Sequence, residues 1–245
     1  MRELTERLSV LSVQFADNVL KENNKFEIVI SNEAELAGLP ESVKAAGAAA
    51  AKERGKEGKW VFTTHKPSLL PFITYAENRT HRMALKKGDN NDELDNKEIA
   101  REMANLRLQK ANLLGYKTHA HFALEDRMLK TPEMVYGLLD QVWPPALQRA
   151  KEERDMMKAM AKSEGQEIEI GPWDWWYYAE KIKMKEYNLD EEEVRPYLKV
   201  DNVINGTFIL ANKLFGLTFE EQTNIPKYHP DVRTYTVKNE KGQLI

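Results

Sequence analysis

Apolar residues recur at helical spacing over most of the chain. The first helix shows this most plainly, with a one-sided stripe made of Leu4, Leu8, Leu11, Phe15 and Val19. After Pro40, which suits a first helical turn, an alanine-rich stretch predicts a second helix that stops at Gly55. Pro67 and Pro71 indicate a turn before a helix that carries Phe72.

Two further helices follow an exposed loop at residues 88–92, which combines turn-forming residues with charge. Asn96 is placed to cap the first of them. Its inward residues are expected to be Ile99, Met103, Leu106 and Leu113. Thr118 opens the second, which is shorter and extends to Met128.

A long helix begins after Thr131, where a capping hydroxyl precedes Pro132 and an acidic residue. The apolar pattern carries this helix to about residue 162. Pro144 and Pro145 lack the backbone donor that a helix interior needs, so we expect a kink near Trp143.

Three shorter elements complete the helical part of the chain. One helix is expected over residues 174–188, and Asp190 is placed to cap a short turn after it. Asp201 or Asn202 is expected to cap the last helix, and Gly216 to close it. The buried residues of this last helix are expected to be Val203, Ile204, Phe208, Ala211 and Phe215.

Strand signals are short. Residues 59–64 are aromatic and β-branched and predict a strand, while residues 26–30 form either a strand or a tucked loop. Near the end of the sequence, alternation at Val232, Thr234 and Thr236 precedes a turn at 239–242 and predicts a hairpin within residues 231–245. The sequence stops inside the second strand of that hairpin, and we interpret its end as a truncation.

These elements predict a mainly α fold with a small β-element at residues 59–64 and 231–245. No repeat or low-complexity linker interrupts the pattern, so residues 1–245 are expected to form a single mainly helical unit without an internal boundary. The net charge of -3, from 36 basic and 39 acidic residues, favours neither nucleic acid nor a membrane surface as a partner. Because the chain has no cysteine, it can form no disulfide framework, thiol nucleophile or cysteine-ligated metal site.

Candidate chemistry is sparse. The chain has 5 histidines, and none stands in an H-E-x-x-H motif, which puts two zinc-binding imidazoles one helical turn apart. The nearest metal-like group is His119 and His121 with Glu125, but only His121 and Glu125 share a helix face, and two ligands do not make a zinc site. No G-x-S-x-G turn or phosphate loop is present. We therefore assign no catalytic or metal-binding residue, and the substrate-binding residues stay unassigned.

An aromatic run at residues 173–178, W-D-W-W-Y-Y, allows two interpretations. Consecutive helical positions point in all directions, which is typical of a helix buried on several sides. The other interpretation is a surface on which a carbohydrate or peptide stacks. Lys181, Lys183 and Lys185 beyond it are expected to form a solvated face, with their apolar stems over the core.

Several segments resemble, in order, the thimet oligopeptidase and peptidyl-dipeptidase family of zinc metallopeptidases. The segment G-P-W-D-W-W-Y-Y at 171–178 looks like the family's P-W-D-x-x-Y-Y, and Y-H-P-D-V at 228–232 is similar to its W-H-P-D-V. Residues 189–197, 203–208 and 214–219 match further family pieces, as do L-P-E-S at 39–42 and P-F-I-T-Y-A-E-N-R at 71–79. Tyr228 and Leu198 stand where the family often carries other aromatic residues.

This resemblance implies a segment of an elongated zincin-type oligopeptidase that cleaves short peptides by metal-assisted hydrolysis. The family's zinc motif lies beyond the region matched here, so the chain is expected to bind no catalytic zinc and to be inactive alone. Its partners would be short peptides, the missing C-terminal catalytic region and other copies of itself. Its expected compartment is the cytoplasm. The alternative is an autonomous, non-catalytic helical binding module or scaffold.

Overall fold

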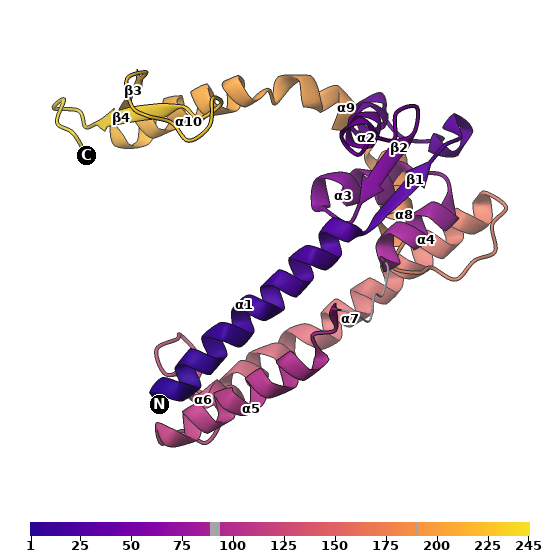
Figure 1. Cartoon of the computed structure of the whole chain (residues 1–245). Coiled ribbons are helices and arrows are strands. Elements are labelled where there is room, and N and C mark those ends of the chain that lie inside the picture. The colour runs from indigo at the N-terminus through magenta and orange to yellow at the C-terminus, as the bar shows by residue number, and fades with distance from the viewer. Residues whose placement is uncertain (89–93, 190) are drawn as a thin grey trace. The chain divides into compact units, whose positions relative to one another are not determined.

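The computed structural model of the protein describes residues 1–88, 94–189 and 191–245 (Figure 1). It is mainly α-helical, with two small antiparallel sheets of two strands each among the described residues, which confirms the expected fold class. The chain divides into two compact units, Met1–Glu186 and Tyr187–Ile245. The expectation of a single unit stays a prediction.

The first unit begins with two paired helices. Helix α1 (Arg2–Lys25) contacts α5 (Lys97–Leu113). The two helices run in opposite directions, as the hydrogen bonds of Arg7 with Glu102 and of Asn18 with Asn96 show. Leu11 of the predicted apolar stripe is buried at their contact.

Several positions of this pair differ from the prediction. Phe15, Val19 and Leu113 are exposed, and the partly buried Asn18 replaces Val19 at the contact. The side chain of Asn96 donates to the carbonyl of Phe15 rather than capping α5, and Asp95 accepts from the first backbone amide of that helix instead. The stripe thus ends in a polar contact between the two helices.

A small sheet forms the centre of the first unit. Strand β1 (Glu27–Ile30) pairs antiparallel with β2 (Trp60–Thr63), as expected for residues 59–64 and as one of the two alternatives for residues 26–30. The 3-10 turn η1 (Glu33–Leu36) and the helices α2 (Glu41–Glu53), α3 (Lys66–Tyr75) and α4 (Arg79–Lys87) pack around it. Its buried core consists of Ile30, Leu36, Leu39, Phe62, Phe72, Ala76 and Leu85.

The turn expected at Pro67 and Pro71 is wrong, because both residues lie inside α3. Pro67 stands in the first turn, where a helix needs no backbone donor. Pro71 removes one hydrogen bond from the helix interior. Phe72 and Ile73 beside it are fully buried, and their packing offsets that loss.

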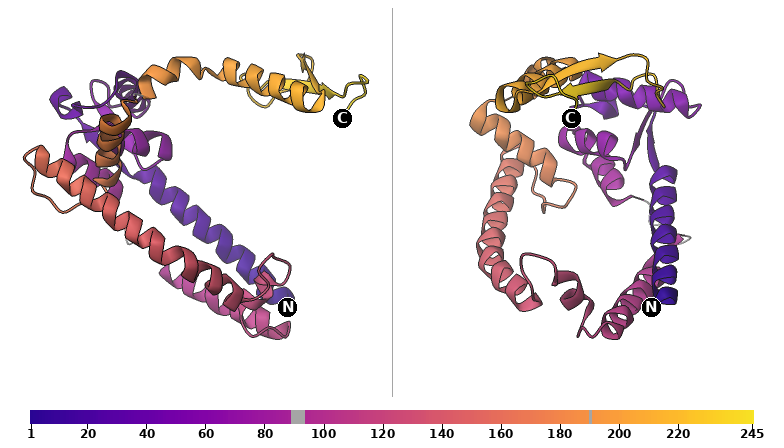
Figure 2. Two further views of the ribbon diagram at one scale, coloured as in Figure 1. Left: turned by 180° about the vertical axis from the view of Figure 1, so that it is seen from behind. Right: turned by 90° about the vertical axis from the view of Figure 1, so that its left-hand side faces the viewer.

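Helix α7 (Pro132–Ser163) is the longest of the described helices (Figure 2). It is capped by Thr131 as predicted. It continues through Pro144 and Pro145, and the kink expected near Trp143 stays a prediction. The shorter α6 (His119–Leu124) begins after Thr118 but ends before the predicted Met128.

Helix α8 (Trp175–Tyr187) closes the first unit and confirms the helix expected over residues 174–188. It packs on the C-terminal half of α7 in a second core cluster of Met157, Ala161, Tyr177 and Tyr178.

The second unit contains α9 (Glu191–Val194), the 3-10 turn η3 (Arg195–Tyr197), α10 (Val200–Phe215) and a sheet of β3 (Thr218–Gln222) with β4 (Thr234–Lys238). Phe208 of α10 stacks on Phe219 of β3 at 4.1 Å between ring centroids and meets Tyr235 of β4 edge-on at 4.9 Å. These three rings attach the helix to the sheet.

The predicted C-terminal hairpin is present, and β4 also pairs with a strand that was not expected. Asn239 accepts from the amide of Gly242, and Leu244 lies opposite Lys238, so the chain does reverse there. The full-length partner of β4, however, is β3, at residues where no strand was expected. The sequence of β3, T-F-E-E-Q, has a single large apolar residue and therefore little alternation to detect.

Helix α10 begins two or three residues earlier than predicted: Lys199 occupies the capping position, and Asp201 lies in the first turn. Gly216 closes it with a φ of 65°, as expected for a glycine cap. Of its five expected buried residues, Val203 and Phe215 are exposed. Asp190 and most of the loop expected at 88–92 lie outside the described residues, within which no helix has the length and apolarity of a membrane span.

Candidate functional site

Two arginines of α4 converge on one carboxylate, and we call Arg79, Arg82 and Asp174 the arginine–aspartate cluster. The arginines share a helix face because they are three positions apart. Nη2 of Arg79 lies 2.8 Å from Oδ2 of Asp174, and Nη2 of Arg82 lies 3.0 Å from its Oδ1. The cluster joins α4 to the segment that precedes α8.

Backbone groups complete the hydrogen bonding of this cluster. The amide of Gly171 donates to Oδ2 of Asp174 at 3.0 Å. Arg82 donates to the carbonyl oxygens of Ala76, Glu77 and Trp173 at 2.7, 3.0 and 3.2 Å. Asp174 is 0% and Arg82 1% exposed, so these bonds replace water around two buried charges.

The charges of the cluster explain its pKa shifts. Burial by itself raises the pKa of Asp174, but hydrogen bonds from Arg79, the Gly171 amide and Arg82 outweigh burial and hold that pKa below its usual value. The bond to Asp174 raises the pKa of Arg79. Asp174 is therefore ionised at neutral pH with its oxygens already occupied. This arrangement fixes backbone geometry and is unsuited to proton transfer.

The aromatic run is mostly engaged with the protein itself. Trp173 lies near two cations, Arg79 at 5.8 Å and Lys87 at 5.2 Å from its ring centre. The guanidinium of Arg82 lies 4.0 Å from the ring centre of Tyr177. Trp176 is the ring of this run that is largely exposed, at 48%. The run thus serves mainly to pack α8, and a stacking surface would have Trp176 as its available ring.

The lysines beyond the aromatic run are less solvated than predicted. Lys181 pairs with Glu164 at 2.7 Å, and its ammonium lies 4.5 Å from the ring centre of Tyr177. Lys183 pairs with Glu180 at 2.7 Å, and both side chains are mostly covered. The prediction of a solvated lysine face is therefore wrong for these two residues, because acidic partners on the same surface hold them against the core.

The metal-like histidines also have local partners. Nδ1 of His121 lies 2.8 Å from the hydroxyl of Thr118, the residue that caps α6. A hydrogen bond between Glu125 and Tyr116 raises the pKa of the tyrosine. Nδ1 of His119 is buried and has no hydrogen-bond partner among the residues that the structure describes. His121 and Glu125 thus interact with different residues and do not form a shared metal site.

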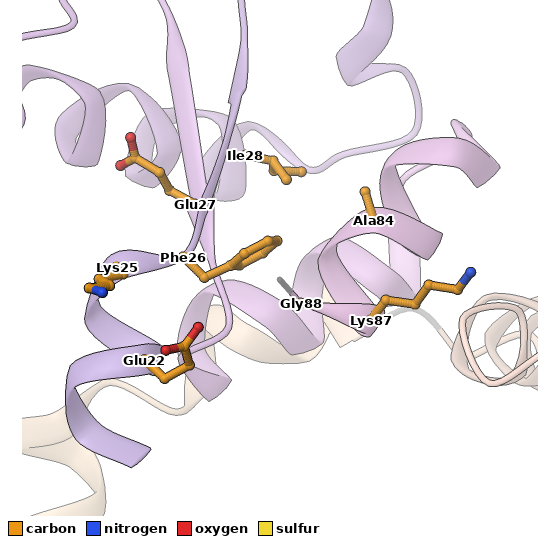
Figure 3. A pocket seen from close by; sticks show the side chains of 8 residues that line it. All are labelled: Glu22, Lys25, Phe26, Glu27, Ile28, Ala84, Lys87 and Gly88. Carbon is orange, nitrogen blue, oxygen red and sulfur yellow. The ribbon is translucent and has the colours of Figure 1, made fainter. Parts of the chain in front are cut away.

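A cavity of about 400 Å³ lies where α1 meets β1 and α4 (Figure 3). Phe26, Ile28 and Ala84 give it an apolar side, and in Figure 3 the ring of Phe26 lies between Glu22 and Ala84. One carboxylate oxygen of Glu22 is buried with no hydrogen-bond partner in the described ranges. Lys87 lines the rim but also contacts Trp173. The cavity has no nucleophile with an adjacent base, so its geometry supports binding rather than catalysis.

This cavity could not be predicted from the sequence. Its lining comes from two segments that are far apart along the chain, residues 22–28 and 84–88, and no motif unites them. The apolar residues 26–30 were the available signal, since they begin directly after a helix that ends in charged residues.

Comparison with sequence models of protein families identifies the family of the chain. The sequence model of Peptidase family M3 matches residues 72–245. The chain belongs to peptidase family M3. This match covers most of the chain and confirms the resemblance to the thimet oligopeptidase and peptidyl-dipeptidase family.

Individual relatives of this M3 chain agree with that assignment. Oligopeptidase A of Haemophilus influenzae is 36% identical over 251 residues, which cover 99% of the chain and 37% of the relative. Dipeptidyl carboxypeptidase of Escherichia coli is 32% identical over 99% of the chain and 36% of the relative. A protein of Arabidopsis thaliana named "Probable cytosolic oligopeptidase A" is 33% identical over 98% and 36%. The M3 chain thus spans little more than a third of the length of these relatives.

Two segments that carried the resemblance meet in the structure. The end of P-F-I-T-Y-A-E-N-R supplies Arg79, and P-W-D supplies Asp174, which binds it. Sequence spacing alone gave no sign that these motifs touch, because they are 95 positions apart. In this M3 chain, both motifs therefore hold two distant segments of the first unit together.

The described residues do not fit a catalytic zinc ion. Such an ion takes three protein ligands and keeps one position open for water. Within residues 1–88, 94–189 and 191–245, no group of three or more His, Asp or Glu side chains is arranged to hold a metal. His121 and Glu125, the nearest candidates, are bonded to Thr118 and Tyr116 instead. No catalytic step is assigned to these residues.

Proposed function

We propose that this M3 chain is the helical framework of a zinc-dependent oligopeptidase or peptidyl-dipeptidase that hydrolyses short peptides. The observation that carries the proposal is the family match over residues 72–245. The names of two relatives, oligopeptidase A and dipeptidyl carboxypeptidase, support the substrate class. The scaffolding role is supported by the arginine–aspartate cluster, in which family motifs bind each other.

We further propose that the zinc ligands lie outside these 245 residues, in a catalytic region with which the chain must combine. The chain contains no H-E-x-x-H motif, and its relatives extend well beyond the matched segment. On this proposal, the chain alone binds no zinc at a one-to-one ratio and hydrolyses no peptide.

A segment exchange tests the framework role. The 245 residues replace the matched segment of Haemophilus influenzae oligopeptidase A, and hydrolysis of a quenched-fluorescence peptide is measured with and without a chelator. The expected result is chelator-sensitive hydrolysis by the exchange protein. A soluble, zinc-loaded exchange protein without activity would contradict the framework role.

The isolated chain is the second half of this test. Its zinc content and hydrolysis are measured after expression in Escherichia coli lacking its own dipeptidyl carboxypeptidase, which is 32% identical to the chain. A mock preparation from the same host gives the background. One bound zinc per chain together with chelator-sensitive turnover above that background would refute inactivity of the chain alone.

The isolated chain should also self-associate, because large apolar side chains are exposed on α1 and α7. Sedimentation velocity between low and high micromolar concentration measures this, and a monomer at all concentrations would contradict it. The proposed compartment is the cytoplasm, supported by the name of the Arabidopsis relative. Fractionation of source cells with an antibody against the chain tests that proposal.

The alternative of a non-catalytic binding module gains no support from the comparisons, since the named relatives are peptidases. The exchange experiment separates the two functions, because a binding module has no reason to restore hydrolysis in a relative.

A further inference from the structure

Helix α10 has two apolar faces, and only one of them is covered within its unit. The covered face meets β3 and β4 through Phe208, with the partly buried Ile204 and Ala211 beside it. The second face, which we call the outer stripe, consists of Val200, Val203, Thr207, Leu210 and Leu214. All five residues of the outer stripe are exposed.

The spacing of the outer stripe identifies the kind of surface that it fits. Its residues are separated by three, four, three and four positions, which is the spacing of an a/d seam between packed helices. Its four large apolar side chains are exposed by 73%, 49%, 57% and 63% in chain order. A partner helix is therefore expected, because a/d side chains pack into holes between the side chains of a facing helix.

The rest of the helix surface is different in character. The side opposite the outer stripe carries Asn202, Asn205, Asn212 and Lys213, which suit water. Ile209 lies on this polar side and is 57% exposed, as is its neighbour Leu210 on the outer stripe. The outer stripe is thus a continuous row of exposed apolar residues, whereas Ile209 and Phe215 are single exposed apolar side chains outside it.

We propose that the outer stripe of α10 packs against a helix of the M3 peptidase that lies outside these 245 residues. The inference rests on the proposed function. The chain covers 37% of Haemophilus influenzae oligopeptidase A, so most of the relative has no counterpart here, while α10 lies inside the family match. The partner is an amphipathic helix with an apolar seam of matching length.

A second copy of the chain is the weaker occupant. The outer stripe provides about two heptads, whereas a self-supporting coiled coil is typically recognised over three to four. A helix of the same polypeptide needs less contact, because covalent connection places it at an effective concentration on the order of millimolar. A short seam is therefore better matched to a partner within one polypeptide than to a free copy.

Cysteine labelling tests the proposal directly, since the chain has no native cysteine. Leu210→Cys and Ile209→Cys are placed in the isolated chain and in the oligopeptidase A exchange protein. Maleimide labelling at each site is followed by peptide mass spectrometry. Both cysteines should react at similar rates in the isolated chain, and Leu210→Cys alone should become at least ten-fold slower in the exchange protein. Equal rates for Leu210→Cys in both proteins would overturn the inference.

Charge substitution provides the second measurement, with Leu210→Asp as the test and Ile209→Asp as its control of equal exposure. In the exchange protein, Leu210→Asp should lower Tm by about 4 °C and Ile209→Asp should not. In the isolated chain, neither should lower Tm. A lower Tm for Leu210→Asp in the isolated chain would place the partner within the 245 residues and overturn the inference.

The remaining outcomes separate this inference from the proposed function. A defined dimer of the isolated chain that Leu210→Asp dissociates and Ile209→Asp leaves intact would make a second copy the occupant, and the inference would fail. An active exchange protein in which the two variants behave alike would leave the proposed function standing and refute the outer stripe. An inactive exchange protein that still protects Leu210→Cys would refute the proposed function alone.

Discussion

The arginine–aspartate cluster of the first unit and the outer stripe of α10 in the second differ in how far their side chains are buried and in contact with the protein. Asp174 is 0% exposed and accepts hydrogen bonds from two arginines and a backbone amide. Leu210 of the outer stripe is 57% exposed, although its spacing is that of a packed helix face. The comparison teaches that this M3 chain contains both a buried polar cluster whose hydrogen bonds are made and a helix face that stays exposed although its spacing suits packing.

The largest effect should come from breaking the cluster with Asp174→Ala. Removal of the carboxylate leaves Arg82 buried without its charge partner, which costs about 3–5 kcal/mol of unfolding free energy. All tryptophans of the chain lie before residue 187, so tryptophan fluorescence during urea unfolding reports on the first unit.

Asp126→Ala is the control for this substitution, because the side chain of Asp126 is 80% exposed in the same unit. Its effect should stay within about 0.5 kcal/mol. If both variants unfolded at the same urea concentration, the cluster would not be the support that its geometry indicates.

Acid should weaken the cluster without any substitution, because it protonates Asp174. The pKa of Asp174 is lower in the folded state than its ordinary value, so the contribution of Asp174 to stability is full above pH 4 and is lost as pH falls through the folded pKa. Urea unfolding of the natural chain and Asp174→Asn from pH 7 to pH 2 measures this loss. The stability difference between the two proteins should narrow below about pH 4. A constant difference over that range would contradict the shifted pKa.

Gly47→Ala tests a second buried region of the first unit, the core around the sheet of β1 and β2. A Cβ at Gly47 in α2 would lie 2.7 Å from Cζ of Phe62, which is itself buried in the core. Overpacking costs about 1–3 kcal/mol and exceeds the roughly 1 kcal/mol that alanine gains over glycine in a helix. The free energy of unfolding should therefore fall, as measured by urea unfolding followed by tryptophan fluorescence. A gain in stability would contradict this and show that the core rearranges to accept the added methyl group.

Gly206→Ala is the matched change on the uncovered side and has the smallest expected effect. Gly206 also lies within a helix, but a Cβ there meets nothing within 4 Å. The isolated chain should gain about 0.5–1 kcal/mol because alanine favours the helix. Hydrogen exchange of the α10 amides measures this gain, since the second unit contains no tryptophan. Faster exchange after the substitution would mean that α10 is already closely packed at Gly206.

Local signals explain which elements could be predicted. Thr118 and Thr131 begin helices as expected, because a capping hydroxyl acts on backbone amides two or three positions away. The assignment failed for β3, whose strand character depends on pairing with β4 and on the ring of Phe208. It failed for Pro71 because burial of Phe72 and Ile73 outweighs the local preference against proline.

The sequence by itself determined the helical class and the family, since helical period, capping residues and family motifs are each readable within a few positions. Only the tertiary structure decided that Arg79 and Arg82 bind Asp174, that Lys181 is held by Glu164, and that Phe26 and Ala84 line a cavity. Those facts depend on contacts between segments far apart along the chain. A local pattern states which face of a helix is apolar, and the packing of other segments decides whether that face is covered.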